Sequence, residues 1–450
     1  MTFRIQKILF KLASLFFISS FFSSCMTMAD YDYTSIDNSI SVCDYSTAAE
    51  ILENQKYYYY SSHEKVLQYL DQGLLLHFAH EFDASTENLD LAEKEIDFNY
   101  TKSISQQVGK VLVNDNVADY EGEVYEDIYS NIFMCLNYIH LKKNDDAMVE
   151  IRRFDNKMKV AGSKFQAEIN QAKLKMKSEY HSDEALLKDT DITFYNSAFA
   201  RYLSMLLYRT QNDYYSAKID YDKITEAFWA QKNIYNFSMP ENLQDELELP
   251  EKFARVNLVS FTGLGPLKYE EVLRIPFSGA YYKLALPVMR RRGSFVYRAE
   301  IVLKNCESAQ EYSTDAYTIE SIQNIAADTY KQHYGAIYAR TLMRSISKSV
   351  GSGVMKAVAK NAEDQNIRAA FGFLNFVSQI STEVTERADV RICRYFPATV
   401  KVAGINVPQG IYDVEVRYYN AKGNCIYTDI QKNVEAKIGE LNLIESAYLR

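Results

Sequence analysis

The residues that break helices are concentrated in the second half of this chain. All seven prolines and twelve of the sixteen glycines lie after residue 239. Inside a helix, proline costs about 3 kcal/mol and glycine about 1 kcal/mol, so the stretch 44–237, which has no proline and four glycines, favours helices throughout. The first half is therefore expected to be a helical array, and the second half to contain the strands.

Three segments of the first half share one spacing of residues. In each, a residue at the expected closest approach of two helices is followed by residues three, nine, twelve and sixteen positions later. This spacing is typical of two antiparallel helices that cross at a small side chain, and it resembles the tetratricopeptide helix pair. A generic bundle of helical hairpins is the alternative. The three sets are Gly73, Leu76, Phe82, Ser85 and Leu89; Cys135, Tyr138, Asn144, Ala147 and Ile151; and Met205, Tyr208, Tyr214, Ala217 and Tyr221.

In the second half the apolar residues alternate with polar ones, as they do in strands. This alternation follows an acidic, proline-bounded linker, 238–254, and helical spacing returns within 317–387. The predicted fold class is α+β: an N-terminal α-helical tetratricopeptide-like domain, 45–237, followed by an α+β domain, 255–450, with strands on either side of a helical insertion. The expected strands are 255–262, 293–303, 399–402, 411–419 and 425–430, with a hairpin turn at 420–424.

The N-terminus has the features of an export signal. Arg4, Lys7 and Lys11 precede an uncharged apolar run, 12–22, which is typical of a secretory signal. This run is shorter than the roughly 20 apolar residues that a spanning helix needs. Residues 1–24 are therefore expected to be a signal peptide.

The signal ends at a cysteine. Phe21-Phe22-Ser23-Ser24-Cys25 resembles the lipobox of bacterial lipoproteins, in which the cysteine becomes the acylated N-terminus; secretion with a chance cysteine is the alternative. The resemblance implies that acyl chains on Cys25 hold the protein to a membrane, with 25–44 as a tether. Met26 after the cysteine resembles the signal for sorting to the outer membrane.

The charge of the chain bears on its partners. It has 59 acidic and 50 basic residues, a net charge of −9. Nucleic acids are bound by clustered Lys and Arg, so no nucleic acid partner is expected. One segment, 331–360, nevertheless contains basic residues and no acid, which suits anionic lipid heads or an acidic partner; pairing with the acidic helical half is the alternative. Its basic residues are Lys331, Arg340, Arg344, Lys348, Lys356 and Lys360.

No motif in the chain predicts a reaction. The glycines of 262–267 lack the residues that complete a phosphate-binding loop, and His77 and His80 have no further ligand nearby to complete a zinc site. The acidic stretch 115–123 lacks the pattern of a calcium loop; we expect it to place negative charge at the N-terminus of a helix that begins at Val124. Neither a cofactor nor a metal is expected.

Several stretches resemble a group of uncharacterised tetratricopeptide-like bacterial lipoproteins: 114–116, 120–123, 136–138, 147–153, 199–202 and 386–391. The resemblance implies an envelope location and no assigned reaction. Glu150 and Arg153 are expected to form a pair on a helix surface. Glu386, Asp389 and Arg391 are expected to latch a helix end to the next strand. The candidate binding or latch residues are Tyr120, Gly122, Glu123, Glu150, Arg153, Glu386, Asp389 and Arg391.

Taken together, these patterns favour a membrane-anchored envelope adaptor. Its helical half is expected to bind a protein or peptide partner of the envelope in a groove lined by tyrosines, whose large side chains give contact area at little entropy cost. One alternative is an envelope enzyme that acts on cell wall or glycan, with Glu121 and Glu123 as acid and base. Another is a structural envelope protein that binds lipid through the basic segment.

Overall fold

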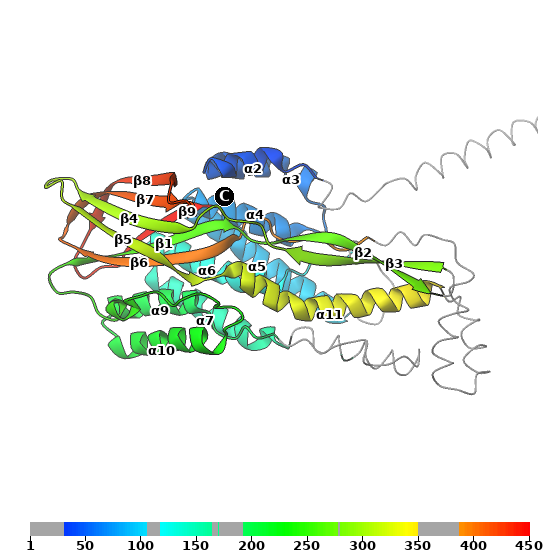
Figure 1. Cartoon of the computed structure of the whole chain (residues 1–450). Coiled ribbons are helices and arrows are strands. Elements are labelled where there is room, and N and C mark those ends of the chain that lie inside the picture. Colours follow the sequence, from blue (N-terminus) through cyan, green and yellow to red (C-terminus); the bar gives the residue numbers. More distant parts are fainter. Residues whose placement is uncertain (1–30, 106–117, 164–169, 171–191, 278–279, 350–386) are drawn as a thin grey trace, which may run out of the picture.

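The computed structural model describes residues 31–105, 118–163, 170, 192–277, 280–349 and 387–450 (Figure 1). It is a mixed α+β protein in which helices from the first half pack on a sheet from the second half. Several predicted residues lie outside the described ranges: Cys25, Lys356, Lys360 and Glu386. In the described part of the chain, no helix combines the length and the apolar character needed to cross a membrane.

The first half consists of helical hairpins. Within it, α2 packs on α3, α4 on α5, α6 on α7, and α9 on α10. The three helix pairs expected from the spacing are present as the last three of these hairpins. The helices are α2 (Thr34–Ser41), α3 (Tyr45–Tyr59), α4 (Lys65–Phe78), α5 (Phe82–Ser105), α6 (Val124–His140), α7 (Asn144–Ala161), α9 (Ala198–Thr210) and α10 (Tyr214–Ala230).

Each of the four hairpins turns through three residues, the middle one in the left-handed region of the backbone. The middle residues are Cys43, His80, Lys142 and Asn212, with φ between 58° and 63°. In every turn the residue after it donates its backbone N–H to a carbonyl five positions back, as Glu81 does to Leu76 at 2.9 Å. This is a common way to satisfy the last carbonyls of a helix, and its repetition makes the four hairpins equivalent units.

The first hairpin lies partly in the segment expected to be a tether. From Thr34 onward this segment is folded, because Ile36 and Ile40 are buried against the helical core. The prediction of a tether as far as residue 44 was wrong for these residues. The spacing of three, nine, twelve and sixteen also fits Ile36, Ser39, Tyr45, Ala48 and Leu52, and therefore would have identified a fourth pair.

The sheet of the second half has seven strands in the order β8-β7-β4-β5-β6-β1-β9. Neighbours are antiparallel except β1 and β9, which run parallel. The edge strands meet, since Gln431 of β8 donates to the carbonyl of Glu445 in β9 at 2.7 Å. The strands are β1 (Ala254–Leu264), β4 (Arg298–Asn305), β5 (Glu311–Glu320), β6 (Pro397–Val407), β7 (Gly410–Tyr419), β8 (Cys425–Ala436) and β9 (Asn442–Tyr448).

The two faces of the sheet bury different residues. In β1, Val259 and Phe261 belong to the core shared with the helices, whereas Val256 and Leu258 point into a second core enclosed by the sheet. This alternation follows the two-residue period of a strand. Residues on both sides of segment 238–254 therefore share one core.

A long hairpin and a helix extend together from this body (Figure 1). Strands β2 (Leu267–Phe277) and β3 (Ala280–Arg290) pair only with each other among the described strands, and α11 (Ile322–Ser349) packs along β3. A two-stranded ribbon alone is marginal in water, so α11 supports it. Helical structure in this region begins at Ile322; residues 317–320, which were expected to be helical, belong to β5.

Candidate functional site

Four of the candidate residues meet in one buried cluster where the start of α6, strand β2 and the segment 387–394 come together. Glu123, at the start of α6, forms an ion pair with Lys268 of β2. Lys268 also donates to the backbone carbonyl of Arg391 at 2.9 Å. The guanidinium of Arg391 binds both oxygens of Asp389, at 2.9 and 2.8 Å, and lies over the ring of Tyr120 at 5.3 Å.

Local sequence explains how Glu123 reaches this position. Glu123 and Glu126 form a capping box at the N-terminus of α6, which satisfies backbone N–H groups that have no partner within the helix. Within the acidic stretch 115–123, Glu123 thus places negative charge at the start of the helix as predicted, whereas Asp119 pairs with Lys102 and His63. Gly122 precedes Glu123 with φ of 74°, a conformation that favours glycine, and a Cβ there would approach the side chain of Ile96 to 3.2 Å.

The surroundings of the three carboxyl groups in the cluster shift their pKa values in different directions. Burial alone would raise the pKa of Glu123, but the neighbouring His333 and Lys268 outweigh it and hold that pKa well below its usual value. Burial, together with the charge of Glu123, raises the pKa of Glu126 to about 7. Burial opposes ionisation of Asp389 too, yet Arg391 lowers its pKa to about 2.

This cluster joins the segment after α11 to the start of α6. Arg391 donates to the carbonyl of Ala118 at 2.9 Å, and the backbone N–H of Cys393 donates to Glu126 at 2.7 Å. Asp389 and Arg391 thus form a latch. It ties residues 387–394 to the start of α6 and to β2, whereas the sequence predicted a latch between a helix end and the next strand. Because the Glu123 side chain is 1 % exposed and held by Lys268 and His333, its geometry is that of a structural ion pair.

Glu150 and Arg153, which were expected to form a pair on a helix surface, are placed differently. Glu150 of α7 is buried and accepts a hydrogen bond from Asn131 of α6 at 2.7 Å. Arg153 lies 3.5 Å from Glu150 and 3.2 Å from Glu93 of α5, with half of its side chain exposed. The prediction of a surface pair was wrong for Glu150, because the facing helix α6 covers it.

Further buried polar contacts tie the first helix of each of the last three hairpins to the sheet half. Glu445 of β9 contacts His77 of α4 at 2.7 Å and His140 of α6 at 2.9 Å. Tyr129 of α6 donates to Glu320 at the end of β5. Removing one partner of such a buried contact costs more than the contact itself contributes.

In α9, Arg209 makes the buried polar contacts with the sheet half. It forms an ion pair with Glu246 of the 3-10 helix η6 (Leu243–Glu246) and donates to Asn257 of β1 at 2.7 Å. Glu246 also binds Arg255 at 2.6 Å. Segment 238–254, which was expected to be a linker, therefore contributes a fully buried carboxylate to the interface between the two halves.

Apolar contacts converge on the same interface. The ring of Phe261 in β1 lies 5.7 Å from Phe78 of α4, 5.3 Å from Phe133 of α6 and 6.0 Å from Phe199 of α9. One side chain of the sheet thus contacts the first helix of three successive hairpins. The surface that these helices share is covered by the chain's own sheet.

The second helices face outward, and among those in the described part of the chain α10 has the most aromatic outer face. Tyr215, Ile219 and Trp229 are 78 %, 45 % and 74 % exposed, and the exposed acidic residues Asp222 and Glu226 lie between them. These five positions fall on one stripe of the helix, at steps of three or four residues. By contrast, many other tyrosines of the helical half are buried, among them Tyr59, Tyr125, Tyr129 and Tyr202.

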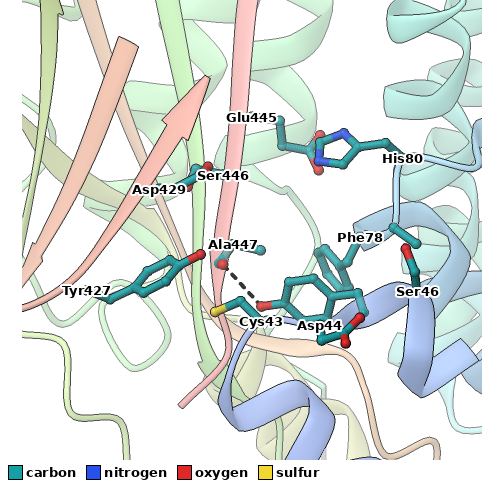
Figure 2. Close-up of a pocket in the computed structure, with 12 residues that line it drawn as sticks. Cys43, Asp44, Ser46, Phe78, His80, Tyr427, Asp429, Glu445, Ser446 and Ala447 are labelled. Carbon is teal, nitrogen blue, oxygen red and sulfur yellow. Dashed lines mark hydrogen bonds between the residues drawn. The ribbon is translucent and has the colours of Figure 1, made fainter. Parts of the chain in front are cut away.

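A cavity of about 180 Å³ opens where the turns of the first two hairpins, α2–α3 and α4–α5, approach β8 and β9 (Figure 2). Cys43, His80, Tyr427 and Glu445 line it, together with Tyr45, which donates to the carbonyl of Ala447 at 3.0 Å. Burial lowers the pKa of His80 and raises that of the Cys43 thiol. Both shifts favour the uncharged forms of these two side chains. Burial opposes ionisation of Glu445, which also lines the cavity, but His77 and His140 hold its pKa below the usual value.

The remaining candidates are placed only in part. Arg340, Arg344 and Lys348 belong to α11, of which only the backbone is described at these positions, while Lys331 lies 3.0 Å from Asp328. Within the described ranges, no group of three or more His, Cys, Asp or Glu side chains is arranged to hold a metal ion.

Comparison with known proteins gives no match: no family model, no curated protein and no solved structure is similar to this chain.

Proposed function

We propose that this protein is an envelope lipoprotein, anchored through acyl chains on Cys25, and that it acts as an adaptor for another protein. The helical half is a tetratricopeptide-like array of four hairpins, and the α+β half is its fixed support. The observation that carries the adaptor role is the aromatic stripe of α10, formed by Tyr215, Ile219 and Trp229.

The position of the stripe follows from the coverage of the inner helices. In an array of helix pairs, one layer of helices is usually available for ligands, because each repeat contacts only its neighbours. Here Phe261 and the contacts of Glu445 occupy that layer. The sequence predicted a groove lined by tyrosines. Because the sheet covers the first helices, we propose instead that the partner binds the outer face of α10.

The chemistry of the stripe indicates the kind of partner. Tyrosine and tryptophan are enriched among the residues that contribute most to protein interfaces. Asp222 and Glu226 lie between the apolar residues, but Asp222 is already paired with Lys218 and Glu226 accepts a hydrogen bond from Tyr195 at 3.3 Å, so the complementary surface has apolar pockets with a polar rim. Since this chain has a net charge of −9, a basic partner is favoured over a second copy.

Site-specific photocrosslinking in living cells tests this proposal. A photoreactive amino acid in place of Tyr215, in the full chain, should give one discrete adduct, and Trp229→Ala should remove it. Glu87 is the matched control, because it is an exposed residue of α5, another second helix. Equal adducts from positions 215 and 87, or none from 215 in correctly localised protein, would count against the proposal.

A further inference from the structure

The first described residues are fixed to the end of α3. The ring of Tyr31 contacts that of Tyr58 at 5.5 Å, and Tyr33 stacks on Tyr59 at 4.8 Å. Tyr59 also donates to the carbonyl of Asp32 at 3.3 Å. The chain that leads to Cys25 therefore departs from this end of the α2–α3 hairpin, and not from its turn.

This attachment limits how far the protein can lie from its anchor. Only residues 26–30 separate Cys25 from Tyr31, and six residue steps reach at most about 20 Å when fully extended. A tether as far as residue 44 would have allowed roughly three times that reach. With Cys25 acylated, the end of α3 must remain close to the bilayer surface.

The residues at that end suit the boundary between lipid and water. Tyr57 is 88 % exposed and Tyr58 51 % exposed in the described part of the chain. Next to them, the charge of Lys56 is paired with Glu53 at 2.5 Å, and the exposed carboxylate of Asp32 lies at the same end of the hairpin. Tyrosine is enriched at membrane interfaces, where its ring lies among the lipid headgroups and its hydroxyl remains hydrated.

We propose that Tyr57 and Tyr58 insert into the headgroup region of the anchoring membrane and orient the protein on it. This inference rests on the proposed acylation of Cys25. The occupant of the patch is a phospholipid surface, because the short chain to Cys25 brings the patch within reach of the bilayer whatever other partner is present. In this orientation the opposite end of the hairpin, at Val42, points away from the membrane and is separated from Tyr57 by about 20 Å, the length of the fifteen residues of α3.

Fluorescence quenching by lipid tests this orientation. Trp229 is the chain's single tryptophan, so Trp229→Phe gives a background in which one new tryptophan reports its own surroundings. The acylated full chain is reconstituted in vesicles of phosphatidylethanolamine and phosphatidylglycerol, with or without phosphatidylcholine brominated near the headgroup. Tyr57→Trp is the test variant, and Val42→Trp is the matched control, because Val42 is a 71 % exposed residue of the same hairpin.

The bromolipid should quench the tryptophan introduced at position 57 and leave the one at position 42 unchanged. Tyr58→Trp should repeat the result at position 57. If both ends are quenched equally, or neither is, in protein that floats with the vesicles, the orientation is wrong although the anchor is present. If the acylated chain fails to float with vesicles, the proposed lipoprotein itself is wrong. Flotation and quenching thus separate the two proposals.

Discussion

The first and second helices of the hairpins differ in how much of their surface is covered. Fourteen of the seventeen residues of α6 are buried, against four of the seventeen in α10. Helix α6 packs on α7 and α5 and contacts the sheet through Phe133 and Tyr129, whereas α10 contacts mainly α9. The first helix thus has a face committed to the fold, whereas α10 has a free outer face whose residues can vary without loss of the core.

The largest expected effect comes from the committed face. Phe261→Ala removes the ring that contacts three first helices, and burial of this kind predicts a loss of about 3–5 kcal/mol in the free energy of unfolding. Urea unfolding followed by circular dichroism measures it, and helix and strand signals should change together. The control is Phe295→Ala, because Phe295 is 65 % exposed. If Phe261→Ala leaves the unfolding of the helical half unchanged, the two halves unfold independently.

The buried latch should give the next largest effect. Asp389→Asn leaves the buried guanidinium of Arg391 without its counter-charge, which predicts a loss of about 3 kcal/mol at neutral pH. The control is Asp222→Asn on α10, whose exposed pair with Lys218 should leave stability unchanged.

The pH dependence sharpens this prediction. The pKa of Asp389 is lowered from 3.8 to about 2 in the folded state. Between these values the unfolded state binds more protons, so the stabilisation by Asp389 is present above about pH 4 and is lost as the pH falls towards 2. The difference between the parent protein and Asp389→Asn should therefore shrink over this range, as measured by urea unfolding at each pH. A difference that stays constant would show that Asp389 does not titrate in this way.

A smaller effect is expected within a hairpin. In Gly73→Ala, the new Cβ would meet the side chain of Leu89 at 2.8 Å and its backbone nitrogen at 3.3 Å, so α4 and α5 must move apart, which predicts a loss of about 1–2 kcal/mol. Thermal unfolding measures it. Gly162→Ala is the control, because no atom lies within 4 Å of its added Cβ. Equal stability of the two variants would mean that Gly73 is not at a close approach.

The smallest effect on stability is expected on the free face. Tyr215→Ala and Trp229→Ala together should change the free energy of unfolding by less than about 0.5 kcal/mol, because both side chains are exposed. The same double variant should lose the crosslinked partner. A large loss of stability would show that the stripe belongs to the fold and would remove the support for a binding face.

Local patterns in the sequence predicted part of this structure. The scarcity of proline and glycine before residue 239 indicated helices, and the spacing around Gly73 and Cys135 indicated where hairpins turn. The acidic residues before Val124 indicated the start of α6, which the capping box confirms. Each of these signals depends on contacts between residues close together in the chain, for which composition and periodicity are sufficient.

The features that the sequence did not predict depend on contacts between residues far apart in the chain. Strand β9 was not predicted, and it pairs parallel with β1, almost 190 positions earlier. Strands β2 and β3 carry Pro276 and Pro287, which count against a strand unless it lies at an edge. The resemblance singled out Glu123 and Asp389, but Lys268, which contacts Glu123, had no local signal. Glu150 was misplaced because a pair three residues apart gives no indication of the helix that faces it.

The coverage of the inner helices also has a consequence for biosynthesis. The ribosome makes α4, α6 and α9 before Phe261, and Glu445 follows Phe261 by 184 positions. Until those segments emerge, the apolar faces of nearly complete hairpins have nothing to cover them, and such intermediates are prone to aggregate. Nascent chains that end before β1 should therefore depend on holding chaperones more than finished ones do.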